Sequence, residues 1–270
     1  RSRSSKKLPL EILTMVAILV FLNLLTSPEK SRPEDTELNI SVIQTAKPVR
    51  TLDPPEEVLT DFGEKNKLLK EASKISEVVI FPESADFSKT LAGFLDPPSA
   101  RKYFAGLLQK NILIIDHNMI PEPEGLKSKV IFIDSKEGVA GFYDKKLLTP
   151  GGESLPYLAR LPLWIFEKLF KTDFISSSAV FARGVGGNIL SHGKNDIKLV
   201  VCSDIISPGI SREGKFDFMV NLQNLAVFNG SPMMGRELLS IARFRAVENG
   251  KYLILSSNYG RSYVINNRGD

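Results

Sequence analysis

Cys202 is the only cysteine of the chain, and its thiol is a candidate for covalent chemistry. It follows the apolar part of "KLVVCSD", residues 198–204, a pattern typical of a buried strand. Cysteine is often buried as a small apolar side chain, and it is a nucleophile where a base lies close to it in the fold. The stretch by itself leaves both interpretations open.

Two other predicted strands end in side chains that complement a thiol. "VVIFPE", residues 78–83, ends at Glu83, and "GFYDKKLL", residues 141–148, carries Lys145. A partly desolvated carboxylate can take the proton of a thiol, and a fixed ammonium can stabilise the oxyanion that forms on an acyl carbon. Because side chains past the strand ends line the crevice of an α/β sheet, Glu83, Lys145 and Cys202 form a candidate set for acyl transfer.

The elements that must position these residues follow from the alternation of patterns after residue 38. Near-continuous apolar strands between amphipathic helices predict an α/β fold in which helices cover the sheet. The stretches "KVIFID" and "VAGFYDKKLL", at residues 129–134 and 139–148, flank a "SKEG" turn and predict a hairpin. The expected helices cover 54–76, 99–110 and 233–251, and the expected strands cover 38–46, 77–83, 111–117, 198–202 and 252–258.

The first residues predict a membrane anchor. Residues 1–7 form a basic flank, which the positive-inside rule places in the cytoplasm, and residues 8–25 predict one transmembrane helix. Residues 26–37 read as a polar linker, and residues 38–270 as an extracytoplasmic catalytic domain. A cleaved signal peptide and a buried core helix are the alternatives for residues 8–25. The chain begins without Met and stops after a predicted strand, so we interpret it as a fragment whose C-terminus is truncated.

Composition argues against several other classes of protein. The chain has 43% apolar and 24% charged residues, and its net charge of +4 comes from 35 basic and 31 acidic residues spread along the sequence. This balance does not predict a nucleic-acid partner. Without a Cys/His cluster we expect no metal and no cofactor. We expect the two histidines, His117 and His192, at the surface or in turns.

An ordered set of motifs resembles the nitrilase (carbon–nitrogen hydrolase) superfamily. The set consists of "FPE" after a strand, then "YDKKLLTPGGE" at residues 143–153, then a strand that ends in Cys202. The late segment at residues 235–269 is similar to one branch of this superfamily, the bacterial apolipoprotein N-acyltransferases. The predicted membrane helix and the L-x-P-x-G-E form favour the same branch.

The resemblance implies an α/β/β/α sandwich and assigns a role to each candidate residue. Glu83 becomes the general base, Lys145 the cation that stabilises the oxyanion, and Cys202 the nucleophile. Glu153 matches the second glutamate of the family, and Ser203 is assigned a backbone N–H that binds the oxyanion. The chain departs from the branch in Cys202-Ser203-Asp204, where Cys-Tyr-Glu is usual, in Gly151-Gly152 before Glu153, where Phe-Gly is usual, and in Arg236-Glu237, where Gln-His is usual.

The function that the resemblance implies is transfer of an acyl chain from a phospholipid, through a thioester on Cys202, to the N-terminal amine of diacylglyceryl-cysteine apolipoproteins. The resemblance places such an enzyme in the bacterial inner (plasma) membrane, with its catalytic domain on the periplasmic side. A nitrilase-type amidase, in which water replaces the amine, and an inactive extracytoplasmic binding domain are the alternatives.

The segment at residues 155–170, "LPYLARLPLWIFEKLF", directly follows the motif that carries Glu153. It is either a helix packed on the core or an arm that lies against the bilayer, so that a lipid chain can reach Cys202. For the arm we expect Trp164, Phe166 and Phe170 to contact lipid.

Overall fold

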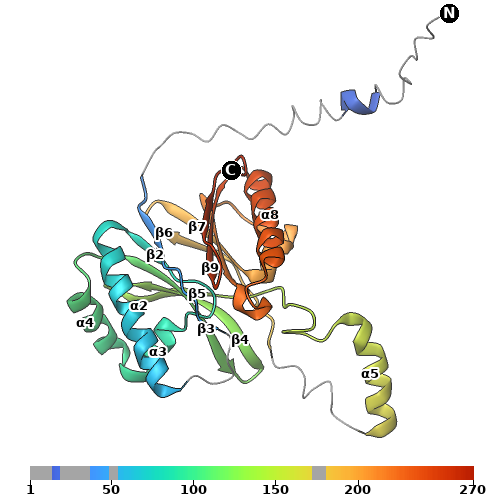
Figure 1. Ribbon diagram of the computed structural model, residues 1–270, viewed down its shortest axis with the longest axis horizontal. Coiled ribbons are helices and arrows are strands. Elements are labelled where there is room, and N and C mark those ends of the chain that lie inside the picture. The colour runs from blue at the N-terminus through green and yellow to red at the C-terminus, as the bar shows by residue number, and fades with distance from the viewer. Residues whose placement is uncertain (1–13, 19–36, 49–53, 172–180) are drawn as a thin grey trace, which may run out of the picture. The chain divides into compact units, whose positions relative to one another are not determined.

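The computed structural model describes residues 14–18, 37–48, 54–171 and 181–270 (Figure 1). The chain divides into two units, Arg1–Thr36 and Glu37–Asp270, and all candidate site residues belong to the second. Of the predicted membrane helix at 8–25, only residues 14–18 are described, and they are helical and exposed. Within the described ranges, no helix combines the length and the apolar character that crossing a bilayer requires. The remainder of residues 8–25 lies outside the described residues.

In the described part of the chain, ten strands form two five-stranded sheets. The first sheet has the order β1-β2-β3-β4-β5 and the second the order β10-β9-β8-β7-β6. The strands are β1 (Ile40–Val42), β2 (Val78–Ile80), β3 (Leu113–Glu122), β4 (Gly125–Asp134), β5 (Gly138–Asp144), β6 (Ile189–His192), β7 (Asn195–Val201), β8 (Phe218–Asn224), β9 (Tyr252–Asn258) and β10 (Tyr263–Ile265).

Three apolar clusters lie between four layers, which are helices, the first sheet, the second sheet and a further helix layer. One cluster lies between the sheets and includes Ile115 and Val201, a second joins the first sheet to its helices through Leu69 and Phe87, and a third joins the second sheet to α8 through Ala242. Figure 1 shows α2, α3 and α4 beside the first sheet and α8 beside the second. This arrangement confirms the predicted α/β sandwich. The helices are α2 (Pro55–Ile75), α3 (Phe87–Phe94), α4 (Pro97–Leu107), α5 (Tyr157–Phe170), α7 (Pro208–Arg212) and α8 (Pro232–Asn249), with 3-10 turns η1 (Cys202–Ile206) and η2 (Leu225–Phe228).

Local signals explain where the main helices begin and end. The side chain of Asp96 caps α4 by accepting a hydrogen bond from the Ser99 N–H at 2.9 Å. α8 ends at Gly250, whose φ of 61° suits glycine in the left-handed region. α3 and β8 were not predicted, and β1 is shorter than the expected strand at 38–46.

The topology directs the critical strand ends to one edge of each sheet. β1, β2 and β3 are parallel, and β5 runs in the same direction because two antiparallel steps separate it from β3. β7, β8 and β9 are parallel in the second sheet. The Thr45–Asn258 bridge ties the two sheets together beside these ends, so loops from both sheets can share one cavity.

Candidate active site

Cys202 is the first residue of η1 and occupies the sharp turn directly after β7. Its φ is +46°, which is uncommon for a residue other than glycine and is held only where the surrounding structure enforces it. A strand that turns abruptly into a helical segment presents the side chain at the turn above the sheet edge. The partly buried thiol is therefore directed to the edge where the loops of the sheets meet.

Lys145 follows β5 directly and is almost wholly buried. Its Nζ lies 2.7 Å from Glu153 Oε1 and 3.9 Å from Glu83 Oε1. The neighbouring Lys146 instead pairs with Glu213 at 2.9 Å, as expected for adjacent residues that point in opposite directions. Burial alone would lower the pKa of Lys145, but the negative groups around it outweigh burial and raise that pKa, so the ammonium stays charged.

Glu83 lies in the loop between β2 and α3, and its carboxyl group is buried. Burial raises its pKa to about 7, the Lys145 ammonium opposes that rise, and Glu153 adds to it. The Asn224 backbone N–H and the Cys202 thiol interact with the same carboxyl group and also lower its pKa. A carboxyl group with this pKa exchanges protons readily near neutral pH, as a general base must.

The Cys202 thiol is not a preformed thiolate. Burial and the negative charge of Glu83 raise its pKa well above the ordinary range, against the opposing effects of Lys145 and of the Ser203 backbone N–H. The raised pKa favours the protonated thiol, so chemistry by a thiolate at this position would need a base that takes the proton.

These side chains open into one cavity of about 990 Å³. Glu83, Lys145, Glu153 and Cys202 all belong to its wall, so the structure brings the predicted set together. Much of the remaining wall is apolar, and it includes Phe94, Met119, Leu126, Phe181 and Val227. A reactive thiol beside a large apolar cavity suits a substrate with an acyl chain.

Asp204 and Ser203 tie the turn at Cys202 to the loop that carries Lys145. The buried Asp204 carboxylate accepts hydrogen bonds from the Tyr143 hydroxyl at 2.8 Å, the Leu147 N–H at 2.7 Å and the Val201 N–H at 3.2 Å. The Ser203 hydroxyl donates to the Leu147 carbonyl. The departure from Cys-Tyr-Glu thus gives a short carboxylate that holds the turn at Cys202 against the loop that carries Lys145.

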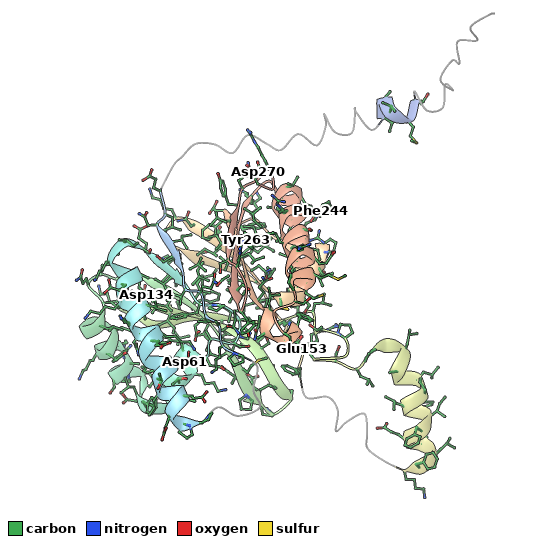
Figure 2. The ribbon with its side chains drawn as sticks, viewed as in Figure 1. Asp61, Asp134, Glu153, Phe244, Tyr263 and Asp270 are labelled. Atoms are coloured by element: carbon green, nitrogen blue, oxygen red, sulfur yellow. The ribbon has the colours of Figure 1, made fainter. Side chains whose placement is uncertain are left out.

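Most of the segment at 155–170 forms α5 (Tyr157–Phe170), and several of its large apolar side chains are exposed. Trp164 is 48%, Phe166 47% and Phe170 62% exposed, and the Phe166 and Phe170 rings lie 4.4 Å apart. Figure 2 marks Glu153 on the segment that leads toward this helix. The exposure disagrees with a helix packed on the core, whereas lipid contact by these residues remains a prediction.

The sequence reasoning missed three residues around the site. Asn224 and Asn258 end β8 and β9 at the cavity wall and are joined by a hydrogen bond of 2.8 Å. His117 is fully buried, so its predicted surface position was wrong. The period of two in β3 contained the signal, since His117 falls on the same face as Leu113 and Ile115.

Comparison with known proteins adds sequence relatives, although no protein-family model matches the chain. The apolipoprotein N-acyltransferase of Allorhizobium ampelinum is 27% identical over 203 residues, and that of Geobacter metallireducens is 30% identical over 203 residues. Each match covers 72% of this chain and 36% of the relative. The chain thus spans little more than a third of the length of these curated relatives.

Solved structures of the nitrilase type share the fold. An amidase from Nesterenkonia sp. aligns with a TM-score of 0.59 and 18% identity, covering 86% of this chain and 84% of the amidase. A CN-hydrolase superfamily protein from Xanthomonas campestris aligns with a TM-score of 0.60 and 17% identity, covering 86% and 84%. The fold and the sequence relatives together support the nitrilase superfamily and its apolipoprotein N-acyltransferase branch.

Proposed function

We propose that this chain carries the catalytic domain of a membrane-anchored acyltransferase that acylates the N-terminal amine of diacylglyceryl-cysteine apolipoproteins. One observation carries the proposal: a buried carboxyl group, a buried ammonium and a cysteine on a strained turn share one largely apolar cavity. The sequence relatives, which are apolipoprotein N-acyltransferases, point to the same reaction.

The first half-reaction loads the enzyme. The Cys202 sulfur attacks the ester carbonyl carbon of a phospholipid while its proton passes to Glu83. The Lys145 ammonium and the Ser203 backbone N–H stabilise the oxyanion. When the carbon–oxygen bond of the ester breaks, Glu83 returns the proton to the departing alkoxide. The lysophospholipid then dissociates, and the acyl chain remains on Cys202 as a thioester.

The second half-reaction transfers the acyl chain. The lipoprotein amine attacks the thioester carbonyl, Glu83 takes a proton from the nitrogen, and the carbon–sulfur bond breaks. The thiolate then recovers the proton from Glu83, which leaves an amide product and the resting thiol. The same groups thus serve both steps, as covalent catalysis in two stages requires.

The anchor and the location belong to the proposal. Residues 8–25 would span the inner membrane and place residues 38–270 on the periplasmic side, where α5 reaches the bilayer through Trp164, Phe166 and Phe170. The test is protease treatment of spheroplasts that express the full chain. Digestion of the domain at 38–270 supports this orientation, and protection until lysis contradicts it.

Mass spectrometry tests the chemistry. The full chain is incubated with phospholipid vesicles, and the peptide that contains Cys202 is analysed before and after addition of a diacylated lipopeptide. We expect an acyl adduct, released by hydroxylamine, that moves to the lipopeptide. Cys202→Ala should form no adduct while its melting temperature stays close to that of the wild type. An unmodified Cys202 together with an unmodified lipopeptide would refute the proposal.

Hydrolysis of an amide is the second candidate, because several structural neighbours are amidases. One of them has the acetamide moiety of fluoroacetamide covalently added at its active-site cysteine. Release of ammonia from short amides, without acylation of the lipopeptide, would favour this candidate. The large apolar cavity favours the acyltransferase.

A further inference from the structure

The loop that carries Glu83 has an unusual backbone. Directly after Glu83, Ser84 has a φ of 63°, and Asp86 has a φ of 52°. Neither residue is glycine, so both conformations cost free energy and persist only where surrounding contacts enforce them. The position of the Glu83 carboxyl group therefore depends on what holds this loop.

Four contacts hold the loop from β3 and α2. The Ser84 N–H donates to His117 Nδ1 at 2.9 Å, and the Asp86 N–H donates to the His117 carbonyl at 3.0 Å. The Met119 N–H donates to Asp86 Oδ1 at 3.2 Å, and the buried Lys65 ammonium donates to the Ala85 carbonyl. His117 is thus the side chain that meets the backbone immediately after Glu83.

The hydrogen bond from the Ser84 N–H fixes the tautomer of His117, and the second ring nitrogen contacts Ser128. Nε2 lies 2.8 Å from the Ser128 hydroxyl on β4, in a fully buried setting. Because Nδ1 accepts from Ser84, the single proton of a neutral ring must be on Nε2. Burial, aided by the Lys145 ammonium, lowers the pKa of His117 to about 3, so the ring is neutral near neutral pH.

We propose that His117 is a positioning residue for the general base: its neutral ring, oriented by Ser128, accepts the Ser84 N–H and thereby holds the Glu83 carboxyl group against the thiol of Cys202. This inference rests on the proposed function, in which Glu83 takes the thiol proton. His117 touches no reacting atom, and its effect passes through the backbone of one residue. Displacement of a catalytic group by about 1 Å can cost on the order of 100-fold in rate.

Two amide variants separate the two contacts of the ring. In His117→Asn, the side-chain oxygen can take the place of Nδ1 toward the Ser84 N–H, but the amide is too short to reach Ser128. In His117→Gln, the longer amide reaches toward Ser128 and no longer matches the position of Nδ1. Both variants lose the ring and leave a polar group in the same core, so each serves as the matched control for the other.

The measurement uses a water-soluble probe, the p-nitrophenyl ester of a short fatty acid, with the full chain. The limiting rate of Cys202 acylation and the half-saturating ester concentration are determined for both variants, together with melting temperatures. We expect His117→Gln to lower the limiting rate about tenfold or more and His117→Asn to lower it less than about threefold, with little change in half-saturation. Equal losses in the two variants, or a greater loss in His117→Asn, would overturn the proposal.

Nitrogen NMR of the wild-type chain labelled with ¹⁵N-histidine gives a readout that depends on no variant. Nδ1 of His117 should resonate as an unprotonated nitrogen and Nε2 as a protonated one, unchanged across the pH range of activity. A protonated Nδ1 would refute the proposal even if both variants fail to fold. If phospholipid fails to acylate Cys202 but the ester results hold, the lipid function falls and the role of His117 stands.

Discussion

The Lys145 ammonium lies closer to Glu153 than to Glu83, with Nζ 2.7 Å from Glu153 Oε1 and 3.9 Å from Glu83 Oε1. The second oxygen of Glu153 accepts the Thr149 N–H at 2.8 Å, which anchors this carboxylate to its own loop. Glu153 is thus the nearer ion-pair partner of the buried ammonium, at hydrogen-bond distance, although both carboxyl groups raise the pKa of Lys145. Glu83 is close enough for the Lys145 charge to lower its pKa, but its 3.9 Å distance from Nζ is too long for a hydrogen bond.

Glu153→Gln should change the pKa of the proposed general base, Glu83, although the substitution is at another residue. The negative charge of Glu153 raises the pKa of Glu83, so its removal should lower that pKa and shift the acid limb of the acylation profile to lower pH. Because Lys145 loses its nearest partner and moves, the limiting rate should fall by about 10- to 100-fold. The pH dependence of ester acylation checks this, and a limb that moves to higher pH would contradict it.

The raised pKa of Glu83 should appear in the stability of the protein as well as in its activity. Burial raises the pKa of Glu83 to about 7 in the folded chain, against an ordinary value of 4.5, so folding favours its protonated form. Its contribution to the free energy of unfolding is therefore fully present below pH 4.5 and is lost as the pH rises to about 7. Acylation has the opposite requirement, because the base must be ionised, and it should rise through pH 7.

Chemical denaturation of the wild type and of Glu83→Gln from pH 4 to pH 8 isolates this contribution. The variant should gain stability relative to the wild type as the pH rises through that window. The paired comparison is needed because the lowered pKa of His117 acts in the opposite direction over part of the range. A stability difference that does not change with pH would show that Glu83 is not desolvated.

Asp204→Ala should destabilise the chain strongly. It leaves the partly buried Leu147 N–H and the buried Val201 N–H and Tyr143 hydroxyl without their acceptor, at about 1–3 kcal/mol for each buried group. We expect a loss of about 3 kcal/mol or more in the free energy of unfolding, measured in urea. Tyr143→Phe, which removes one donor, should cost about 1 kcal/mol. Equal effects would contradict a central role for Asp204.

Phe166→Asp on α5 should impair lipid chemistry more than stability. The side chain is exposed, so an added charge costs little in the folded protein but opposes contact with a bilayer. Acylation from phospholipid vesicles should fall about tenfold. Burying a Phe side chain in an apolar medium such as the bilayer contributes about 1.5–3 kcal/mol, and about 1.4 kcal/mol corresponds to a tenfold change. Acylation by the soluble ester should stay near the wild-type value.

Phe244→Asp is the matched control for this variant. Phe244 is 61% exposed on α8, and Figure 2 marks it there, so it offers a similar exposed ring outside α5. We expect it to acylate normally from vesicles. If Phe244→Asp loses as much acylation from vesicles as Phe166→Asp does, the lipid-contact role of α5 is contradicted. A large fall in melting temperature for Phe166→Asp alone would show that α5 has a structural role instead.

Local patterns in the sequence were sufficient for the fold class and for the candidate set. Apolar strands alternating with amphipathic helices predicted the sandwich, because side-chain periodicity is set by each element alone. Glu83, Lys145 and Cys202 were recognisable because each follows a predicted strand, and their roles stay a proposal. The same signals were weak for β8, where polar residues such as Asn221 and Gln223 interrupt the apolar run although both are buried.

Only the tertiary structure decided what surrounds those three residues. The order of strands in the two sheets depends on pairing between segments far apart in the chain, and that order brings the loops after β2, β5 and β7 to one cavity. Burial in that arrangement raises the pKa of Glu83, and the contact between the Ser84 N–H and His117 spans 33 residues. The sequence determines which groups can react, whereas their distances, desolvation and hydrogen-bond partners arise from long-range packing that no local pattern contains.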